Sequence, residues 1–199
     1  MRFALRLDSS FSKTLRGAVA AGSFLGPVAL FAAGCSDPVP PTPQGAFQAT
    51  FLSNNAQCGI AGHNAAIGAV TSSTKDKVLV SGNEGAEVEC TVSGTSTFAV
   101  QAKVTQNGQG LEISIPELTS GATKANPAKG SVNFASAKTS GTSFSSTKDS
   151  PCNFYFDTKS QGVASGRVWI SFDCPKVVQG TMKTCAIGPG FAIFENCGE

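Results

Sequence analysis

The chain has 199 residues, of which 41% are hydrophobic and 14% charged, with 15 Lys and Arg against 13 Asp and Glu. Four of the bases and one acid precede Cys35, so the chain from Cys35 onward carries 11 basic and 12 acidic residues and is close to neutral. Nucleic-acid-binding domains present a basic stripe with interleaved aromatic residues. No such stripe is present, which excludes a nucleic-acid partner.

The first 34 residues have the pattern of an export signal. Basic residues at positions 2, 6, 13 and 16 precede an uncharged segment from Ala18 to Gly34, as in the n-region and h-region of a signal peptide. That segment has 17 residues and is interrupted by glycine and proline, whereas a transmembrane helix needs about 20 apolar residues. A permanent membrane-spanning helix is therefore the weaker interpretation.

The segment from Leu30 to Cys35, Leu-Phe-Ala-Ala-Gly-Cys, resembles the lipobox of bacterial lipoproteins. The resemblance implies that residues 1–34 are removed and that Cys35 receives a lipid that anchors the protein to the membrane. Ala32 stands where a lipobox usually has leucine, and the alternative is an ordinary secretory signal that leaves Cys35 as a free thiol. By analogy with sorting in Gram-negative bacteria, Ser36 implies a location in the outer membrane of the cell envelope.

A proline-rich tether and one domain follow the cysteine. Residues 35–45 contain four of the ten prolines, a composition that favours extended polyproline II structure. At ~3.1 Å per residue, this tether holds the domain up to about 30 Å from the bilayer. Residues 46–199 have the length of a single domain that is large enough to bury a core.

Short runs of alternating apolar and polar residues, separated by Gly, Ser, Thr, Asn and Pro, predict that this domain is all-β. About nine or ten short strands favour an antiparallel β-sandwich or jelly roll, with a flattened barrel as the alternative. Pro116 is expected to end one strand, because proline donates no ladder hydrogen bond, and residues 188–190 to form a turn. The expected strands are 47–51, 66–70, 77–81, 87–92, 98–104, 111–115, 132–134, 152–156, 168–174 and parts of 185–197.

Six cysteines follow Cys35, and an even number in an exported chain predicts disulfides. Metal binding is the weaker interpretation, since there is no Cys-x-x-Cys pair and a single histidine. Cys152 and Cys174 lie on the inward face of two strands that are expected to form a hairpin, so we predict that they pair. The remaining predicted pairs are Cys185 with Cys197, which would close a C-terminal loop, and Cys58 with Cys90.

No motif for catalysis or cofactor binding stands out. A Ser-His-Asp arrangement would have to use His63, and the Gly-x-Ser-x-Gly elbow is absent. Glu87 and Glu89 have the spacing of a glycosidase pair but are typical of a solvated strand face. The domain is similar to small, mostly uncharacterised β-rich envelope lipoproteins that contain cysteines. We therefore expect a non-catalytic module that binds an envelope glycan or protein, without a cofactor; an envelope hydrolase or a protein inhibitor is the alternative.

The only tyrosine and the only tryptophan are the candidate binding residues. On the expected hairpin, Tyr155 and Trp169 both point away from the core and lie opposite or diagonal to each other. Arg167 and Asn153 share that face and offer hydrogen bonds. Outward aromatic residues of this kind stack on sugar rings or anchor protein partners. The alternative is that the pair only stabilises the sheet, or that a neighbouring loop covers it.

Overall fold

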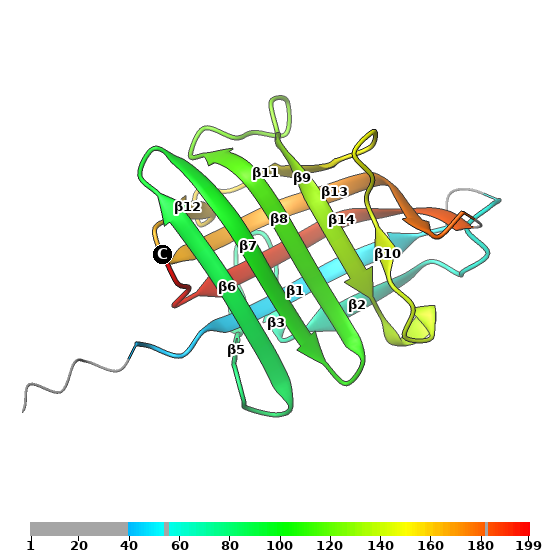
Figure 1. Ribbon diagram of the computed structural model, residues 1–199, viewed down its shortest axis with the longest axis horizontal. Helices are drawn as coiled ribbons and strands as arrows, with labels where there is room; N and C mark the ends of the chain where they lie inside the picture. The colour runs from blue at the N-terminus through cyan, green and yellow to red at the C-terminus, as the bar shows by residue number, and fades with distance from the viewer. Residues whose placement is uncertain (1–39, 54–55, 182) are drawn as a thin grey trace, which may run out of the picture. The chain divides into compact units, whose positions relative to one another are not determined.

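The computed structural model describes residues 40–53, 56–181 and 183–199, which form an all-β fold (Figure 1). The predicted signal peptide, Cys35 and the tether up to residue 39 lie outside these ranges. Within the described ranges, no helix is long and apolar enough to span a membrane. The strands are β1 (Gln44–Leu52), β2 (His63–Ile67), β3 (Ala69–Val70), β4 (Lys75–Lys77), β5 (Leu79–Val80), β6 (Ala86–Gly94), β7 (Thr97–Gln106), β8 (Gln109–Thr119), β9 (Ala128–Ala135), β10 (Phe144–Ser145), β11 (Cys152–Tyr155), β12 (Gly162–Ala164), β13 (Arg167–Gln179) and β14 (Lys183–Glu195), with one 3-10 helix, η1 (Ala137–Thr139).

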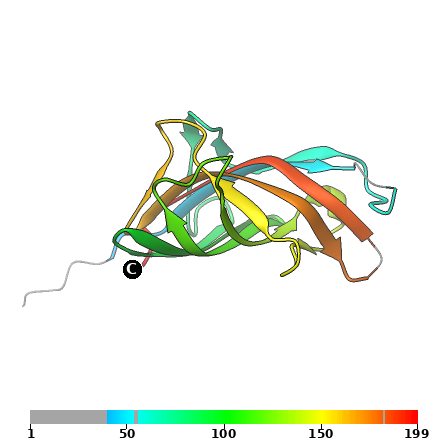
Figure 2. The same cartoon turned by 90° about the horizontal axis from the view of Figure 1, so that it is seen from above.

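The main antiparallel sheet folds into two layers, as predicted for a sandwich. The meander β6-β7-β8-β9 is one layer, and β13-β14-β1-β2 is the other. The strands of the two layers cross in Figure 1, and Figure 2 shows the layers from the side. On one side, β10 and β11 each pair with both β9 and β13 and so join the layers.

The C-terminal tail joins the layers on the other side. After β14 the chain crosses to the free edge of β6, where the amide of Val92 donates to the carbonyl of Gly198 over 2.9 Å. The amide of Gly198 donates to the carbonyl of Cys90 over 3.0 Å. These bonds satisfy backbone groups that an edge strand would otherwise expose to other chains.

The core lies between the layers, where alternation turns one face of each strand inward. In β7, for example, Phe98, Val100, Ala102 and Val104 are buried while the residues between them are largely exposed. Phe51 of β1 and Phe134 of β9 stack across the layers with ring centroids 5.6 Å apart. Aromatic pairs of this kind contribute about 0.5–1.5 kcal/mol beyond their buried area. The fully buried phenylalanines are Phe47, Phe51, Phe134, Phe144, Phe154, Phe172 and Phe194.

Five of the fourteen strands have only two or three residues, namely β3, β4, β5, β10 and β12. β3 lies within the predicted strand 66–70 and β5 within the predicted strand 77–81, whereas β10 and β12 lie outside every predicted strand and β4 shares only Lys77 with one. The other nine strands each overlap a predicted strand. β1 also begins two residues inside the predicted tether, because Gln44 and Gly45 pair with Glu195 and Phe194 of β14.

Two predicted strand ends are wrong, because the strands continue through β-bulges. β8 extends past Pro116 to Thr119, and its register with β7 shifts between Phe98 and Val100, where Pro116 lies. Proline is tolerated at a bulge because its missing donor costs no ladder bond there. The predicted turn at 188–190 likewise lies inside β14, at a register shift against β1.

Three disulfides cross-link the domain. Cys152 of β11 pairs with Cys174 of β13, as predicted. The other two predicted pairs are wrong, since the bonds are Cys58–Cys185 and Cys90–Cys197. Cys185 and Cys197 lie near opposite ends of β14, and twelve extended residues span about 40 Å. The turn that would have brought them together does not form.

Candidate functional site

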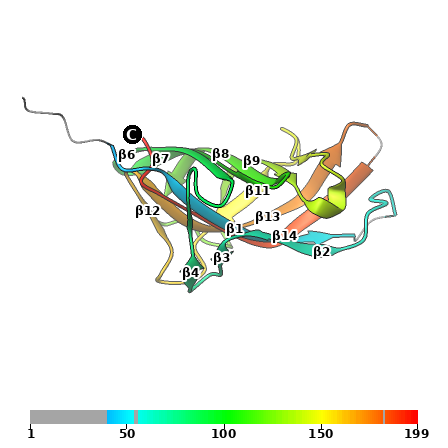
Figure 3. The same ribbon diagram turned by 90° about the horizontal axis from the view of Figure 1, so that it is seen from below.

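Short strands outside the two layers of the main sheet cover part of the outer face of β13-β14-β1. The hairpin of β3 and β4 and the strand β12 project from this face (Figure 3). Beneath the hairpin lies a separate apolar cluster in which Ala46, Val70 and Ile193 are buried. Trp169 packs against this cluster, together with Val78 and Phe191. The predicted outward face of β13 is therefore partly covered by a neighbouring loop.

Trp169 points away from the main core, as the alternation in β13 predicts. Its indole Nε1–H donates to the carbonyl oxygen of Thr71 over 3.0 Å, and the side chain is half-buried. Thr71 belongs to the turn between β3 and β4, which is closed by a bond from the Thr71 amide to the Thr74 carbonyl over 2.9 Å. The hydrogen bond and the packing against Ile193 together fix the orientation of the indole.

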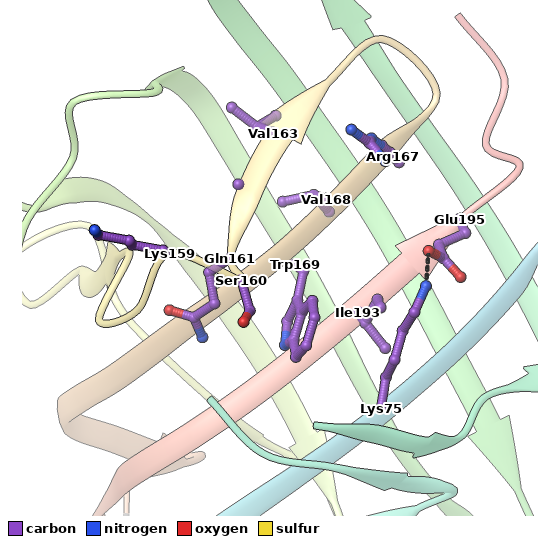
Figure 4. A pocket seen from close by; sticks show the side chains of 11 residues that line it. Lys75, Lys159, Ser160, Gln161, Val163, Arg167, Val168, Trp169, Ile193 and Glu195 are labelled. Atoms are coloured by element: carbon purple, nitrogen blue, oxygen red, sulfur yellow. Dashed lines mark hydrogen bonds and ion pairs between the residues drawn. The ribbon is translucent and has the colours of Figure 1, made fainter. Parts of the chain in front are cut away.

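A cavity of about 380 Å³ opens beside Trp169 (Figure 4). Gly162 of β12 is the direct cross-strand neighbour of Trp169, and paired residues point to the same side of a sheet. A Cβ on Gly162 would meet no atom within 4 Å, so the glycine leaves the space over the indole open. The lining residues are Lys75, Lys159, Ser160, Gln161, Gly162, Val163, Arg167, Val168, Trp169, Ile193 and Glu195.

Positive charge predominates around the cavity. Lys75 Nζ lies 2.6 Å from Glu195 Oε1, and Gln44 donates to the other oxygen of this carboxylate over 3.3 Å. Arg167 and Lys159 are exposed, and neither forms an ion pair with a described carboxylate. The charge of Glu195 is therefore balanced by Lys75. Arg167 and Lys159 remain as the two cationic side chains at the cavity that have no ion-pair partner among the described residues.

The loop that carries Lys159 is held against β13 by the buried side-chain amide of Gln161. Gln161 is 9% exposed; its Oε1 accepts from the amide of Asp157 over 2.6 Å, and its Nε2 donates to Ser171 Oγ over 2.8 Å. Thr158 Oγ1 donates to the carbonyl of Ser72 over 2.5 Å, which connects the loop to the β3-β4 hairpin. Buried polar groups need such partners, and here they set the position of the cavity wall.

The predicted patch of Tyr155, Trp169, Arg167 and Asn153 is divided by the structure. Trp169 and Arg167 line the cavity. Tyr155 lies opposite Ser171 of β13, so Trp169, two residues along the same face, is its diagonal neighbour, which is one of the two predicted arrangements. Tyr155 is only 2% exposed, however, so the expectation of an exposed Tyr155–Trp169 pair is wrong. The directly paired neighbour of Trp169 is Gly162 of β12, a strand that the sequence did not predict.

Tyr155 and Asn153 belong to a different polar group on the same face. Burial raises the pKa of Tyr155 well above its ordinary value of 10.0, and the nearby carboxylates of Asp173 and Asp157 raise it further. Asn153 donates to Asp173 over 2.8 Å, and Lys124 Nζ lies 5.8 Å from the centre of the Tyr155 ring. Burial and the two carboxylates therefore favour the neutral phenol.

His63, the candidate catalytic histidine, contacts a serine. Its Nε2 lies 2.7 Å from Ser136 Oγ, and its Nδ1 lies 2.9 Å from the carbonyl oxygen of Ala61. A carbonyl therefore occupies the position that an aspartate holds in a triad. Ser136 is 1% exposed, and its hydroxyl caps η1 by accepting from the amide of Thr139. Burial keeps a substrate from the hydroxyl, so the contact fits a structural role.

Several cavity residues carry no local pattern from which their place in the site could be predicted. Lys75, Lys159, Gln161 and Glu195 come from a hairpin, a loop and the end of β14, and they meet only because β12 and the β3-β4 hairpin fold over the sheet. Within the described ranges, no three His, Cys, Asp or Glu side chains gather to hold a metal ion. Comparisons of the chain with models of protein families, with curated proteins and with solved structures find no match.

Proposed function

We propose that this protein is a lipid-anchored lipoprotein of the bacterial cell envelope, located in the outer membrane, and that its β domain is a non-catalytic binding module. The resemblance of residues 30–35 to a lipobox supports the anchor on Cys35. The three disulfides support an exported location, because disulfides persist in oxidising compartments and are rare in the cytosol. The partners are the membrane, through the lipid, and an envelope glycan or protein.

The cavity beside Trp169 is the observation that carries the binding function. Ligand sites are typically concave, with aromatic side chains and a few polar groups that are already in position. Here the indole is held by Thr71, and the wall formed by the loop is held by Gln161. Glycoside hydrolysis needs two carboxylates, but Glu195 is the single acid among the lining residues and is paired with Lys75. Binding therefore has better support than catalysis.

An envelope hydrolase or a protein inhibitor is the alternative. A hydrolase built on the Ser136–His63 contact would need access to a hydroxyl that is 1% exposed. A broad hydrolase screen with a Ser136→Ala control tests this possibility. Activity in the parent protein that disappears in Ser136→Ala would favour the hydrolase over the binding module.

Cell fractionation of a Cys35→Ser variant tests the anchor. We expect the parent protein to enter the detergent phase with the membranes and Cys35→Ser to leave it, because the thioether needs the cysteine sulfur. A Ser9→Ala variant changes the predicted signal outside the lipobox and should fractionate like the parent. Retention of Cys35→Ser in the detergent phase would show that lipid on this residue is not the anchor.

Tryptophan fluorescence tests binding at the cavity, since Trp169 is the only tryptophan. The purified full-length protein is titrated with peptidoglycan fragments and envelope polysaccharides. We expect a saturable change in emission in the parent and none in Gly162→Leu, whose side chain would fill the open space beside the indole. An unchanged emission with every ligand refutes a binding function here, and an equal response in both proteins places the ligand elsewhere.

A further inference from the structure

We infer that the cavity beside Trp169 recognises an acidic saccharide, namely a sugar ring that carries a carboxylate or a phosphate. This inference rests on the proposed binding function and adds the chemical class of the ligand. It depends on three features of the cavity: an indole held in one orientation, an uncovered space above it, and two cations without partners.

The indole provides the surface for the sugar ring. One part of Trp169 packs on the apolar cluster and the rest lines the cavity, so a ligand meets a platform that does not need to be ordered first. Preorganisation lowers the entropic cost of binding. Gly162 is the cross-strand neighbour that would otherwise place a side chain over the platform. A flat ring can therefore approach the indole without displacing protein atoms.

Arg167 provides the recognition of the acid. It lies two residues before Trp169 on β13, and residues at that spacing share one face of a strand and are about 7 Å apart. A ring stacked on Trp169 therefore brings its substituents within reach of the long arginine side chain. The guanidinium group forms paired hydrogen bonds with carboxylate or phosphate oxygens.

Lys159 adds a second positive charge from another wall of the cavity. The Gln161 amide fixes its loop against β13, and Figure 4 shows Lys159 and Arg167 on different sides of Trp169. Like charges around a concave site concentrate the field and attract an oppositely charged ligand. Glu195 does not neutralise them, because its oxygens contact Lys75 and Gln44. A neutral sugar would form no ion pair with either Lys159 or Arg167.

A fluorescence titration of the purified full-length protein distinguishes the possible acids. Galacturonic acid provides the carboxylate and glucose 6-phosphate the phosphate, with galactose and glucose as their neutral partners and inorganic phosphate as a probe without a sugar ring. We expect at least one acidic sugar to bind tenfold or more tightly than its neutral partner, and the difference to shrink as salt is raised. The acidic sugar that binds more tightly shows whether the cavity prefers a carboxylate or a phosphate.

Two charge variants test the role of Arg167. We expect Arg167→Gln to weaken binding of the acidic sugar about tenfold and to leave any binding of the neutral sugar unchanged. Lys176→Gln removes one positive charge from the same strand at an exposed position outside the cavity lining, and it should bind like the parent. Equal losses in both variants would mean that only the net charge of the protein matters and would overturn the inference.

Binding at the cavity and selectivity for acidic sugars are refuted by different results. If neutral and acidic sugars bind equally well and Gly162→Leu abolishes both, the binding function stands and the selectivity for acids is refuted. Selectivity for an acidic sugar is also refuted if inorganic phosphate, which has no sugar ring, binds more tightly than either acidic sugar. If no envelope ligand changes the emission of Trp169, the binding function itself is refuted.

Discussion

Removal of the Cys90–Cys197 disulfide is expected to destabilise the domain strongly. This bond fixes the C-terminal tail to β6, where the tail joins the two layers. The double variant Cys90→Ala/Cys197→Ala removes the bond without leaving a free thiol. The backbone bonds between Val92 and Gly198 remain available in the folded state, so the main effect falls on the unfolded chain.

The size of the effect follows from the length of the loop that the disulfide closes. Cys90 and Cys197 are 107 residues apart, but the Cys58–Cys185 bond provides a shorter path. That path runs from Cys90 back to Cys58, across the bridge and on from Cys185, a loop of about 45 residues whose closure entropy corresponds to about 4 kcal/mol. Since small domains are stable by about 5–15 kcal/mol, the loss is a large fraction of the total.

Urea unfolding followed by Trp169 fluorescence and circular dichroism measures the change. Both proteins are kept under non-reducing conditions so that the other two disulfides persist. We expect the midpoint to fall by about 1.3–4 M, which is about 4 kcal/mol divided by a slope of about 1–3 kcal/mol per M. A loss of less than about 1 kcal/mol, with an unchanged slope, would contradict the closure argument.

Two further predictions concern Gly190 and Tyr155. Gly190→Ala should lower the free energy of unfolding by about 1–3 kcal/mol, because the new Cβ would lie 2.4 Å from the buried Phe172 ring. Gly162→Ala is the control in the same urea assay, because its Cβ would meet no atom within 4 Å. An equal loss of stability in both variants would contradict the reasoning. Burial raises the pKa of Tyr155, so the stability it contributes is complete below about pH 10 and falls at higher pH as the unfolded tyrosine loses its proton first. Urea midpoints measured from pH 8 to 11 should therefore decline less steeply in Tyr155→Phe, and parallel profiles would count against a perturbed phenol.

The alternation of residue types determined the strands and their inward faces. In β6, Val88 and Val92 are buried while Glu87 and Glu89 are exposed, as their spacing predicts. The Cys152–Cys174 pair followed from the same reasoning, because both residues lie on neighbouring strands only 22 residues apart in sequence. Local sequence carries this information because a strand turns successive side chains to opposite sides.

Contacts between distant segments were decided only by the tertiary structure. The Cys58–Cys185 and Cys90–Cys197 bonds join residues 127 and 107 positions apart. The incorrect prediction of a turn at 188–190 was enough to make both predicted pairs wrong. The cavity also depends on such contacts, since Trp169 receives its partner Thr71 from 98 residues away. The sequence determined which way Trp169 points, but a period of two residues says nothing about which loop folds over that face. That choice depends on how well whole segments pack against each other once the sheet has formed.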